Sequence, residues 1–280
     1  MDVTDLSNMD AEKFGCLDRL KRVWAVGAIY GEVDCLRALH EELLPRFRPG
    51  DKLVYLGNYF GTRPTALATL DELLLSRRKL MAMSGEAGPK SFVYLRGARE
   101  EMLTKLLQLQ FAPNPSEVMD WLLDHQMGAV IECYGTPQHV ARAIARETTV
   151  SISRWTSGLR RAINENPGHA ALLSSLRRAA FSRDGRLLFV HASIDVSRPL
   201  NMQKDNFWWD NGRFDDIGAP YYGFRRIIRG YDHGNKGLRL NHPHIATLDG
   251  GSGRGGSLNA VCFSADGDVL DQLSFRPEQA

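Results

Sequence analysis

The chain has 280 residues, of which 43% are hydrophobic and 24% charged, and its formal net charge is +2. A chain of this length can bury a large core, and so small a net charge indicates no polyanionic partner such as nucleic acid. No apolar stretch reaches the about 20 residues that a membrane helix needs, so we expect no membrane partner.

Residues 1–22 lack the basic start and apolar middle of a secretory signal, which favours a cytoplasmic protein. The four cysteines lie far apart and form no Cys-x-x-Cys pair. This spacing fits neither a zinc site nor the disulfide network of a small secreted domain. We therefore expect reduced thiols at Cys16, Cys35, Cys133 and Cys262.

Three strand-turn-helix units follow one another in the first part of the chain. An apolar run over residues 23–31 contains two glycines and leads into a helical pattern over residues 32–44. The same unit recurs twice, over residues 53–60 followed by 64–75, and over residues 92–100 followed by 101–109. Strands of this kind pair in parallel, and the loops at their carboxyl ends meet at one edge of the sheet, where open α/β sheets place their sites.

The loops of these units carry glycines at fixed positions, among them Gly27, Gly57 and Gly97. With this spacing the chain resembles the calcineurin-like metallophosphoesterases, most closely the bacterial relatives of the serine/threonine phosphoprotein phosphatases and diadenosine tetraphosphatases. In that family the loops read Gly-Asp-x-His-Gly, Gly-Asp-x-x-Asp-Arg-Gly and Gly-Asn-His-Glu, and two later loops supply a His and a Gly-His pair. The resemblance implies an α/β fold, a β-sandwich of two mixed sheets flanked by helices.

The first two loops have lost the residues that bind metal in the family. Ala28 and Tyr30 stand where the family has its first Asp and His. In the second loop Asn58 replaces the bridging Asp, Gly61 replaces the second Asp, and Thr62 replaces the phosphate-contacting Arg. An alanine offers no donor atom, and an asparagine offers a carbonyl oxygen without charge.

The third loop has also changed. Ala98 and Arg99 stand in place of the family's Asn ligand and of the His that would protonate the leaving group. A guanidinium stays charged near neutral pH and cannot act as an acid. Glu100 alone matches the family pattern here.

The fourth loop keeps its imidazole, His191, at the end of an apolar strand. In the fifth loop Tyr231 replaces the ligand His, whereas His233 stands where many bacterial relatives have a second His. With the other ligands gone, we expect His191 to form a hydrogen bond with the backbone or with Asp232. We expect Tyr30 and Tyr231 to fill the vacated space, which would otherwise need ordered water.

A two-metal site needs carboxylate or imidazole donors that offset the repulsion between two dications, and the substitutions remove most of them. We therefore predict no catalytic residue, no bound metal and no cofactor, as in a pseudophosphatase. The predicted function is that of a protein-interaction or regulatory module, with a protein partner and the altered cleft as one contact surface.

Two alternatives remain open. The first is a sensor of a phosphorylated or other anionic ligand, bound by Arg99 with help from Arg96 and Arg63, unless Arg99 pairs with a nearby carboxylate instead. The second is a metal-dependent phosphoesterase with a rearranged site built from Asn58, Glu100, His191, Asp232 and His233. The candidate ligand-binding residues are thus Asn58, Arg63, Arg96, Arg99, His191, Asp232 and His233.

The whole chain, residues 1–280, is interpreted as a single domain. Strand-like runs disappear in residues 110–181, where helical spacing predicts an inserted cap near the cleft. The glycine-rich residues 250–256 are interpreted as a flexible loop and not as a nucleotide site, and Trp208 and Trp209 as packing residues. Further strands are expected at residues 186–190, 225–228, 245–248, 259–263 and 269–275.

Overall fold

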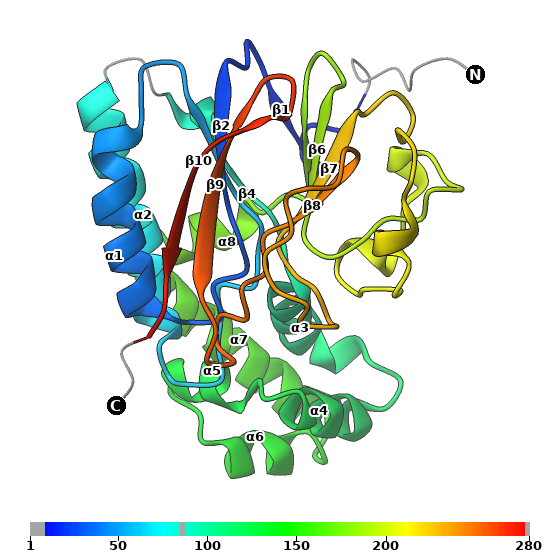
Figure 1. The fold of residues 1–280 in the computed structure, drawn as a ribbon. Helices are drawn as coiled ribbons and strands as arrows, with labels where there is room; N and C mark the ends of the chain where they lie inside the picture. The colour runs from blue at the N-terminus through cyan, green and yellow to red at the C-terminus, as the bar shows by residue number, and fades with distance from the viewer. Residues whose placement is uncertain (1–8, 85–87, 278–280) are drawn as a thin grey trace.

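The computed structural model describes residues 9–84 and 88–277 of the chain, so the first eight residues of the segment assessed for a secretory signal lie outside it. Two five-stranded sheets lie face to face, and helices flank them (Figure 1). This arrangement confirms the predicted α/β sandwich of two mixed sheets.

The first sheet has the strand order β10-β9-β2-β3-β4. As predicted, its three strands from the start of the chain, β2 (Arg22–Val26), β3 (Lys52–Tyr55) and β4 (Phe92–Tyr94), pair in parallel. β9 (Leu258–Ser264) runs antiparallel to β2 and forms the expected hairpin with β10 (Val269–Phe275).

Helices follow the three parallel strands in turn: α1 (Val33–Leu43), α2 (Ala66–Ser84) and α3 (Ala98–Leu107). α1 and α2 cover the outer face of the first sheet (Figure 1). The prediction ended the second helix at residue 75, which was too early. The helix continues because Leu80, which follows a run of basic residues, is buried and extends the apolar spacing of the helix.

The second sheet has the strand order β1-β5-β6-β7-β8. Its members are β1 (Phe14–Leu17), β5 (Ala179–Ser182), β6 (Leu187–Val190), β7 (Arg226–Arg229) and β8 (Ile245–Thr247). The sequence did not predict β1, a four-residue strand that is stabilised by parallel pairing with β5, a partner far away in the chain.

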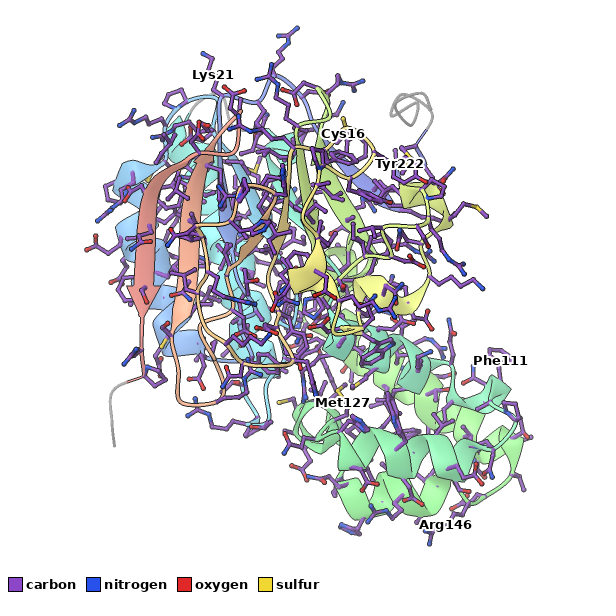
Figure 2. The ribbon with its side chains drawn as sticks, turned by 45° about the vertical axis from the view of Figure 1, so that its right-hand side comes forward. Cys16, Lys21, Phe111, Met127, Arg146 and Tyr222 are labelled. Carbon is purple, nitrogen blue, oxygen red and sulfur yellow. The ribbon has the colours of Figure 1, made fainter. Side chains whose placement is uncertain are left out.

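Five helices follow α3 along the chain and precede β5 of the second sheet. We call residues 115–174, which contain these helices, the cap. They are α4 (Pro115–Asp124), α5 (Gly128–Cys133), α6 (Gln138–Ile144), α7 (Thr149–Glu165) and α8 (His169–Ser174). Figure 2 shows this group projecting from one end of the sandwich, with Met127 close to the sheets and Arg146 at the outer side. Residues 179–181, which the sequence assigned to the insertion, belong to β5.

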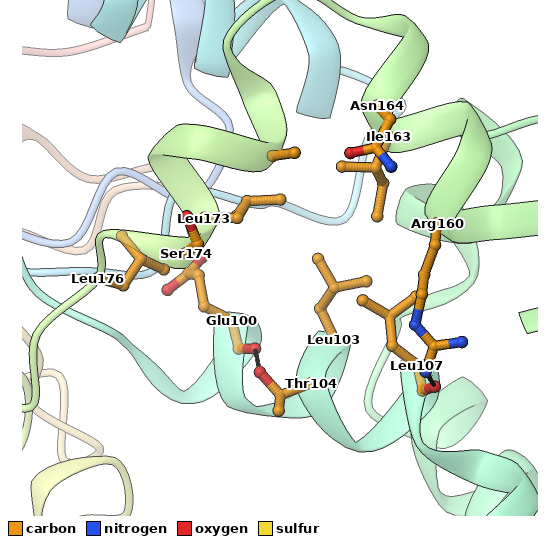
Figure 3. A pocket seen from close by; sticks show the side chains of 11 residues that line it. Glu100, Leu103, Thr104, Leu107, Arg160, Ile163, Asn164, Leu173, Ser174 and Leu176 are labelled. Atoms are coloured by element: carbon orange, nitrogen blue, oxygen red, sulfur yellow. Dashed lines mark hydrogen bonds between the residues drawn. The ribbon is translucent and has the colours of Figure 1, made fainter. Parts of the chain in front are cut away.

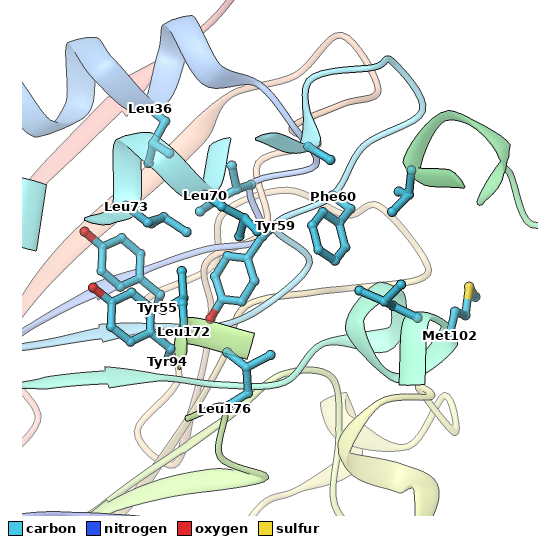
Figure 4. Close-up of a cluster of buried hydrophobic side chains, with 14 of the residues drawn as sticks. Leu36, Tyr55, Tyr59, Phe60, Leu70, Leu73, Tyr94, Met102, Leu172 and Leu176 are labelled. Carbon is cyan, nitrogen blue, oxygen red and sulfur yellow. The ribbon is translucent and has the colours of Figure 1, made fainter. Parts of the chain in front are cut away.

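Buried side chains fill both faces of the first sheet. Val23 and Ala25 of β2 face the second sheet, whereas Trp24 of the same strand faces the helices, because side chains alternate along a strand. On the helix side the rings of Tyr55 and Tyr94 stack with centroids 5.0 Å apart (Figure 4). The four cysteines are free thiols, and no helix in the described residues is both long and apolar enough to span a bilayer.

Candidate functional site

Loops from both sheets meet at the carboxyl ends of their parallel strands, where the sequence placed the site. The Ala28 amide donates to the carbonyl of Gly230 over 3.0 Å, and the Tyr30 amide donates to the carbonyl of Asn58 over 2.7 Å. Both Tyr30 and Asn58 adopt a left-handed backbone conformation with φ of 53°. Main-chain hydrogen bonds therefore join the first loop to the second and the fifth.

Gly57 lies where three loops come closest together. A Cβ atom at this position would lie 2.7 Å from the Gly97 amide nitrogen and 2.9 Å from Nδ1 of His191. Its φ of 93° is also unfavourable for any residue with a side chain. The glycine is thus required by close packing of the second, third and fourth loops.

Glu100 is buried at the start of α3 and holds the second and third loops together. Its carboxylate accepts hydrogen bonds from the backbone amides of Gly97, Asn58 and Tyr59, at 2.9, 2.9 and 2.8 Å. Burial raises the pKa of Glu100, and these amides oppose that shift. The one third-loop residue that matches the family is therefore a brace between loops.

Arg99 joins the cap to the second loop. Its guanidinium donates to the carbonyl oxygens of Gly61, His125 and Gln126, at 2.8, 3.1 and 2.8 Å. Burial lowers the pKa of Arg99, because the charge is removed from water. The expected pairing with Glu100, Asp232 or another carboxylate does not occur among the described residues; backbone carbonyls accept the N–H groups instead.

His191 is fully buried beneath the cleft, and its Nδ1 lies 2.6 Å from the carbonyl oxygen of Leu56. Of the two partners that the sequence left open, the backbone is therefore the one observed. The ring of Tyr231 stacks in parallel on the imidazole, with centroids 5.4 Å apart, and Nε2 of His191 has no hydrogen-bond partner among the described residues. Burial lowers the pKa of His191 to about 4.

This buried imidazole predicts a loss of stability in mild acid. The usual histidine pKa of 6.5 applies to the unfolded chain, so that chain takes up a proton at a pH where folded His191, with a pKa of about 4, does not. The contribution is present above about pH 6.5 and is lost as the pH falls through 4, by about 3.5 kcal/mol in total at about 1.4 kcal/mol per pKa unit. Unfolding free energies at pH 7 and 4.5 should show this fall in the wild type.

The control variants for this prediction are His191→Gln, which removes the buried imidazole, and His139→Gln, which removes an exposed one. We expect a smaller pH-dependent loss in His191→Gln and an unchanged loss in His139→Gln. An equal pH dependence in all three proteins would contradict the assignment to His191.

Tyr30 lies beside Tyr231, with ring centroids 6.0 Å apart. Gly253 allows this packing, since a Cβ atom there would lie 2.4 Å from Cβ of Tyr30. The Arg254 guanidinium covers both rings at 5.8 and 5.6 Å and pairs with Asp249 at 2.6 Å. Two tyrosines and a cation therefore occupy the space between the first, fifth and glycine-rich loops.

The glycine-rich loop is held against the first loop by hydrogen bonds. The Gly251 amide donates to Asp249 over 2.8 Å, and the Ser252 hydroxyl donates to the carbonyl of Ile29 over 2.7 Å. The sequence suggested a flexible loop, because a run of glycines by itself shows no anchoring contact. Here Asp249 and Ser252 supply the anchors.

Asp232 belongs to a buried ionic network and does not face the cleft. Its carboxylate pairs with Arg229 at 3.1 Å and with Arg239 at 3.0 Å. Arg229 is itself almost completely buried and also pairs with Asp210 and Asp215, at 2.9 and 3.2 Å. Asp232 is therefore already neutralised by two guanidinium groups.

A cleft of about 500 Å³ opens between the cap and these loops. Trp121 of α4 meets Trp209 edge to face across it, with centroids 6.1 Å apart. The cleft is lined by Tyr30, Thr62, Ala98, Arg99, Met102, Trp121, Asp124, His125, Gln126, Trp208, Trp209, Asp210, Tyr231, His233, Gly253 and Arg254.

Of the candidate ligand-binding residues, Arg99 and His233 line this cleft. Asn58, His191 and Asp232 are buried behind its wall. Arg63 and Arg96 lie outside the lining and pair with Glu32 and Glu101, at 2.5 and 3.2 Å.

The sequence did not identify several residues of the cleft: Trp121, His125, Asp210 and Arg254. Trp121 belongs to a helical pattern in the sequence, and Arg254 lies in the glycine-rich run that the sequence predicts to be a flexible loop. Arg254 is the only charged residue among the glycines of that loop, a signal that could have marked it.

The side chains of the five loops do not fit a pair of divalent metal ions. Ala28 and Ala98 have no donor atoms, and Tyr231 stacks on His191 where a ligand histidine would stand. Over residues 9–84 and 88–277, no three His, Cys, Asp or Glu side chains are grouped as metal ligands. The guanidinium of Arg99 would also repel a dication, most strongly where water is excluded.

Two solved structures resemble this chain over most of its length. One, of a protein proposed to be a diadenosine tetraphosphatase, has a TM-score of 0.54 and 18% identity, and the match covers 94% of this chain and 97% of that chain. The other, a protein serine/threonine phosphatase from Saccharomyces cerevisiae with similarity to the human phosphatase PP5, has a TM-score of 0.50 and 13% identity, with coverage of 96% and 85%.

The chain therefore has the calcineurin-like metallophosphoesterase fold, as the resemblance implied. At identities this low the likeness concerns the fold alone. No model of a protein family matches the sequence, and no curated protein matches it either.

Proposed function

We propose that this protein is a non-catalytic member of the phosphoesterase fold, which acts by binding and not by hydrolysis. The observation that carries the proposal is the loss of metal donors around His191: Ala28 and Ala98 have no donor atom, and Tyr231 stands in place of a ligand histidine. The stacked tyrosine covers a face of the imidazole and supplies no second imidazole nitrogen to a metal, and the neighbouring alanines add no donor. Without metal ions, the fold has nothing at this place to generate hydroxide or to polarise a phosphoryl oxygen.

The cleft is better suited to contact than to chemistry. Trp121 and Trp209 form an aromatic rim, and the exposed side chain of Phe111 adds an apolar group to the adjoining helical region. Large aromatic side chains with accessible faces are enriched at protein interfaces. These features support the use of the cleft and its rim as a contact surface for a protein partner, in a regulatory or scaffolding role.

The first test is hydrolysis of p-nitrophenyl phosphate by the purified protein, with and without added manganese. We expect no turnover above a protein-free blank in either condition, because the loops leave too few donors for the metal ions that would activate water. The variant His191→Ala should behave identically. Metal-dependent turnover that disappears in His191→Ala would contradict the proposal and favour a phosphoesterase with a rearranged site.

A second candidate function is recognition of an anionic ligand, and one observation favours it. Arg254 extends over Tyr30 and Tyr231 at the cleft and keeps 29% of its side chain exposed. By contrast, Arg99 donates to three backbone carbonyls. If an anion binds here, Arg254 is therefore the more available guanidinium, and the tyrosine rings beneath it would favour an aromatic anion.

Phenyl phosphate is a suitable probe for this second candidate. We expect it to raise the melting temperature of the wild type, because it binds only the folded chain. The rise should be lost in Arg254→Gln and retained in Arg63→Gln, which removes an exposed arginine outside the cleft lining. An equal rise in Arg254→Gln would exclude Arg254 as the anion-binding group.

A further inference from the structure

A second pocket, of about 290 Å³, lies between α3 and the cap helices α7 and α8 (Figure 3). It shares no lining residue with the cleft. Its walls come from the helix that carries Arg99 and Glu100 and from the last two helices of the cap. The pocket is thus placed at the contact between the cap and the rest of the fold.

Part of the wall of this pocket is aliphatic. Leu103 of α3 and Ile163 of α7 are almost completely buried, and Leu107 and Leu173 add half-buried leucine side chains. In Figure 3 these side chains surround the open space from α3, α7 and α8. Such walls favour a hydrocarbon chain, because its burial removes apolar surface from water.

The polar residues of the lining are Glu100 and Thr104 of α3, Ser174 of α8, and Arg160 and Asn164, which lie one helical turn apart on α7. The carboxylate of Glu100 is already held by three backbone amides, which leaves Arg160 and Asn164 as the donors for a ligand. Arg160 donates one hydrogen bond to the carbonyl of Leu107, and no ion pair with a carboxylate is found for it among the described residues. Asn164 is exposed, and its side-chain amide forms no hydrogen bond with any of the residues that the structure describes. A guanidinium has five N–H donors, so Arg160 keeps most of its capacity for an acceptor.

We propose that this pocket binds a small aliphatic carboxylate, with its chain against Leu103, Ile163 and Leu173 and its head group on Arg160 and Asn164. A liquid water molecule occupies about 30 Å³, so the pocket volume corresponds to about ten non-hydrogen atoms. Octanoate has this number of atoms and the required combination of a hydrocarbon chain and one carboxylate. The bound ligand would stabilise the packing of α7 and α8 against α3.

The test is isothermal titration of the full chain with octanoate, with octan-1-ol and hexanoate as controls. We expect saturable binding of octanoate. Octan-1-ol should bind about tenfold more weakly, because it lacks the charge-assisted hydrogen bonds to Arg160. Hexanoate should also bind more weakly, because it buries less chain. No heat with octanoate, or equal affinity for octanoate and octan-1-ol, would overturn the assignment.

Two variants locate the site. Ala170→Phe places a ring in the pocket and should abolish octanoate binding. Arg160→Gln removes the charge and should weaken octanoate binding by about tenfold or more. Arg161→Gln, at the exposed neighbouring position of α7, should bind like the wild type. Circular dichroism of each variant checks the fold. Octanoate binding that is unchanged in folded Ala170→Phe and Arg160→Gln would place the ligand elsewhere and overturn the proposal.

Discussion

Replacement of Glu100 by glutamine should destabilise the protein by about 3 kcal/mol or more. The carboxylate accepts three backbone amides from two loops, and it is 2% exposed. A glutamine would turn an NH₂ group toward at least one of these amides, and a buried donor without an acceptor costs about 1 to 3 kcal/mol. The new donor-donor contact adds to that cost. Urea unfolding followed by tryptophan fluorescence measures the change.

Glu101→Gln is the matched control, because it makes the same chemical change at the next residue. Glu101 is partly buried and pairs with the more exposed Arg96 and Lys105, at 3.2 and 3.7 Å. Pairs of this kind contribute about 0 to 1 kcal/mol. Equal destabilisation by Glu100→Gln and Glu101→Gln would show that Glu100 does not brace the loops.

Arg99→Ala should have the second largest effect, a loss of about 2 to 4 kcal/mol. Hydrogen bonds to charged groups contribute about 1.5 to 3 kcal/mol each, and part of the gain from three such bonds is offset by the cost of burying the guanidinium. The carbonyls of Gly61, His125 and Gln126 lose this donor in the variant. Hydrogen exchange should also become faster at the junction between α4 and α5, which contains two of these carbonyls.

Arg96→Ala is the control for this prediction. It removes a partly exposed guanidinium whose ion pair is with Glu101. We expect a loss of less than about 1 kcal/mol and unchanged exchange at the junction between α4 and α5. If the two alanine variants behaved alike, Arg99 would not be the link between the cap and the second loop.

The sequence predicted the strands and loops of the fold well for a physical reason. The parallel strands β2, β3 and β4 are buried on both faces, so they read as continuous apolar runs, and the loop after each carries a glycine that close packing requires, as at Gly57. β1 was missed because its pairing with β5 is distant in sequence. Local periodicity carries no information about such a partner.

The candidate site was less predictable than the fold. The positions of Tyr231 and Arg99 followed from the family pattern, but their partners did not. Arg99 donates to carbonyls of the cap, which belong to any residue type and leave no mark in the sequence. Arg63 and Arg96 lie in the same predicted cleft loops as Arg99, but ion pairs with Glu32 and Glu101 hold them outside the cleft lining.

The most direct test of a non-catalytic site is the metal content of the protein after incubation with excess manganese and removal of unbound ions. Elemental analysis should find no manganese above a buffer blank, because Ala28, Ala98 and Tyr231 leave too few donors for a dication. His191→Ala should give the same result. Stoichiometric manganese in the wild type that is lost in His191→Ala would contradict this account and identify a rebuilt metal site.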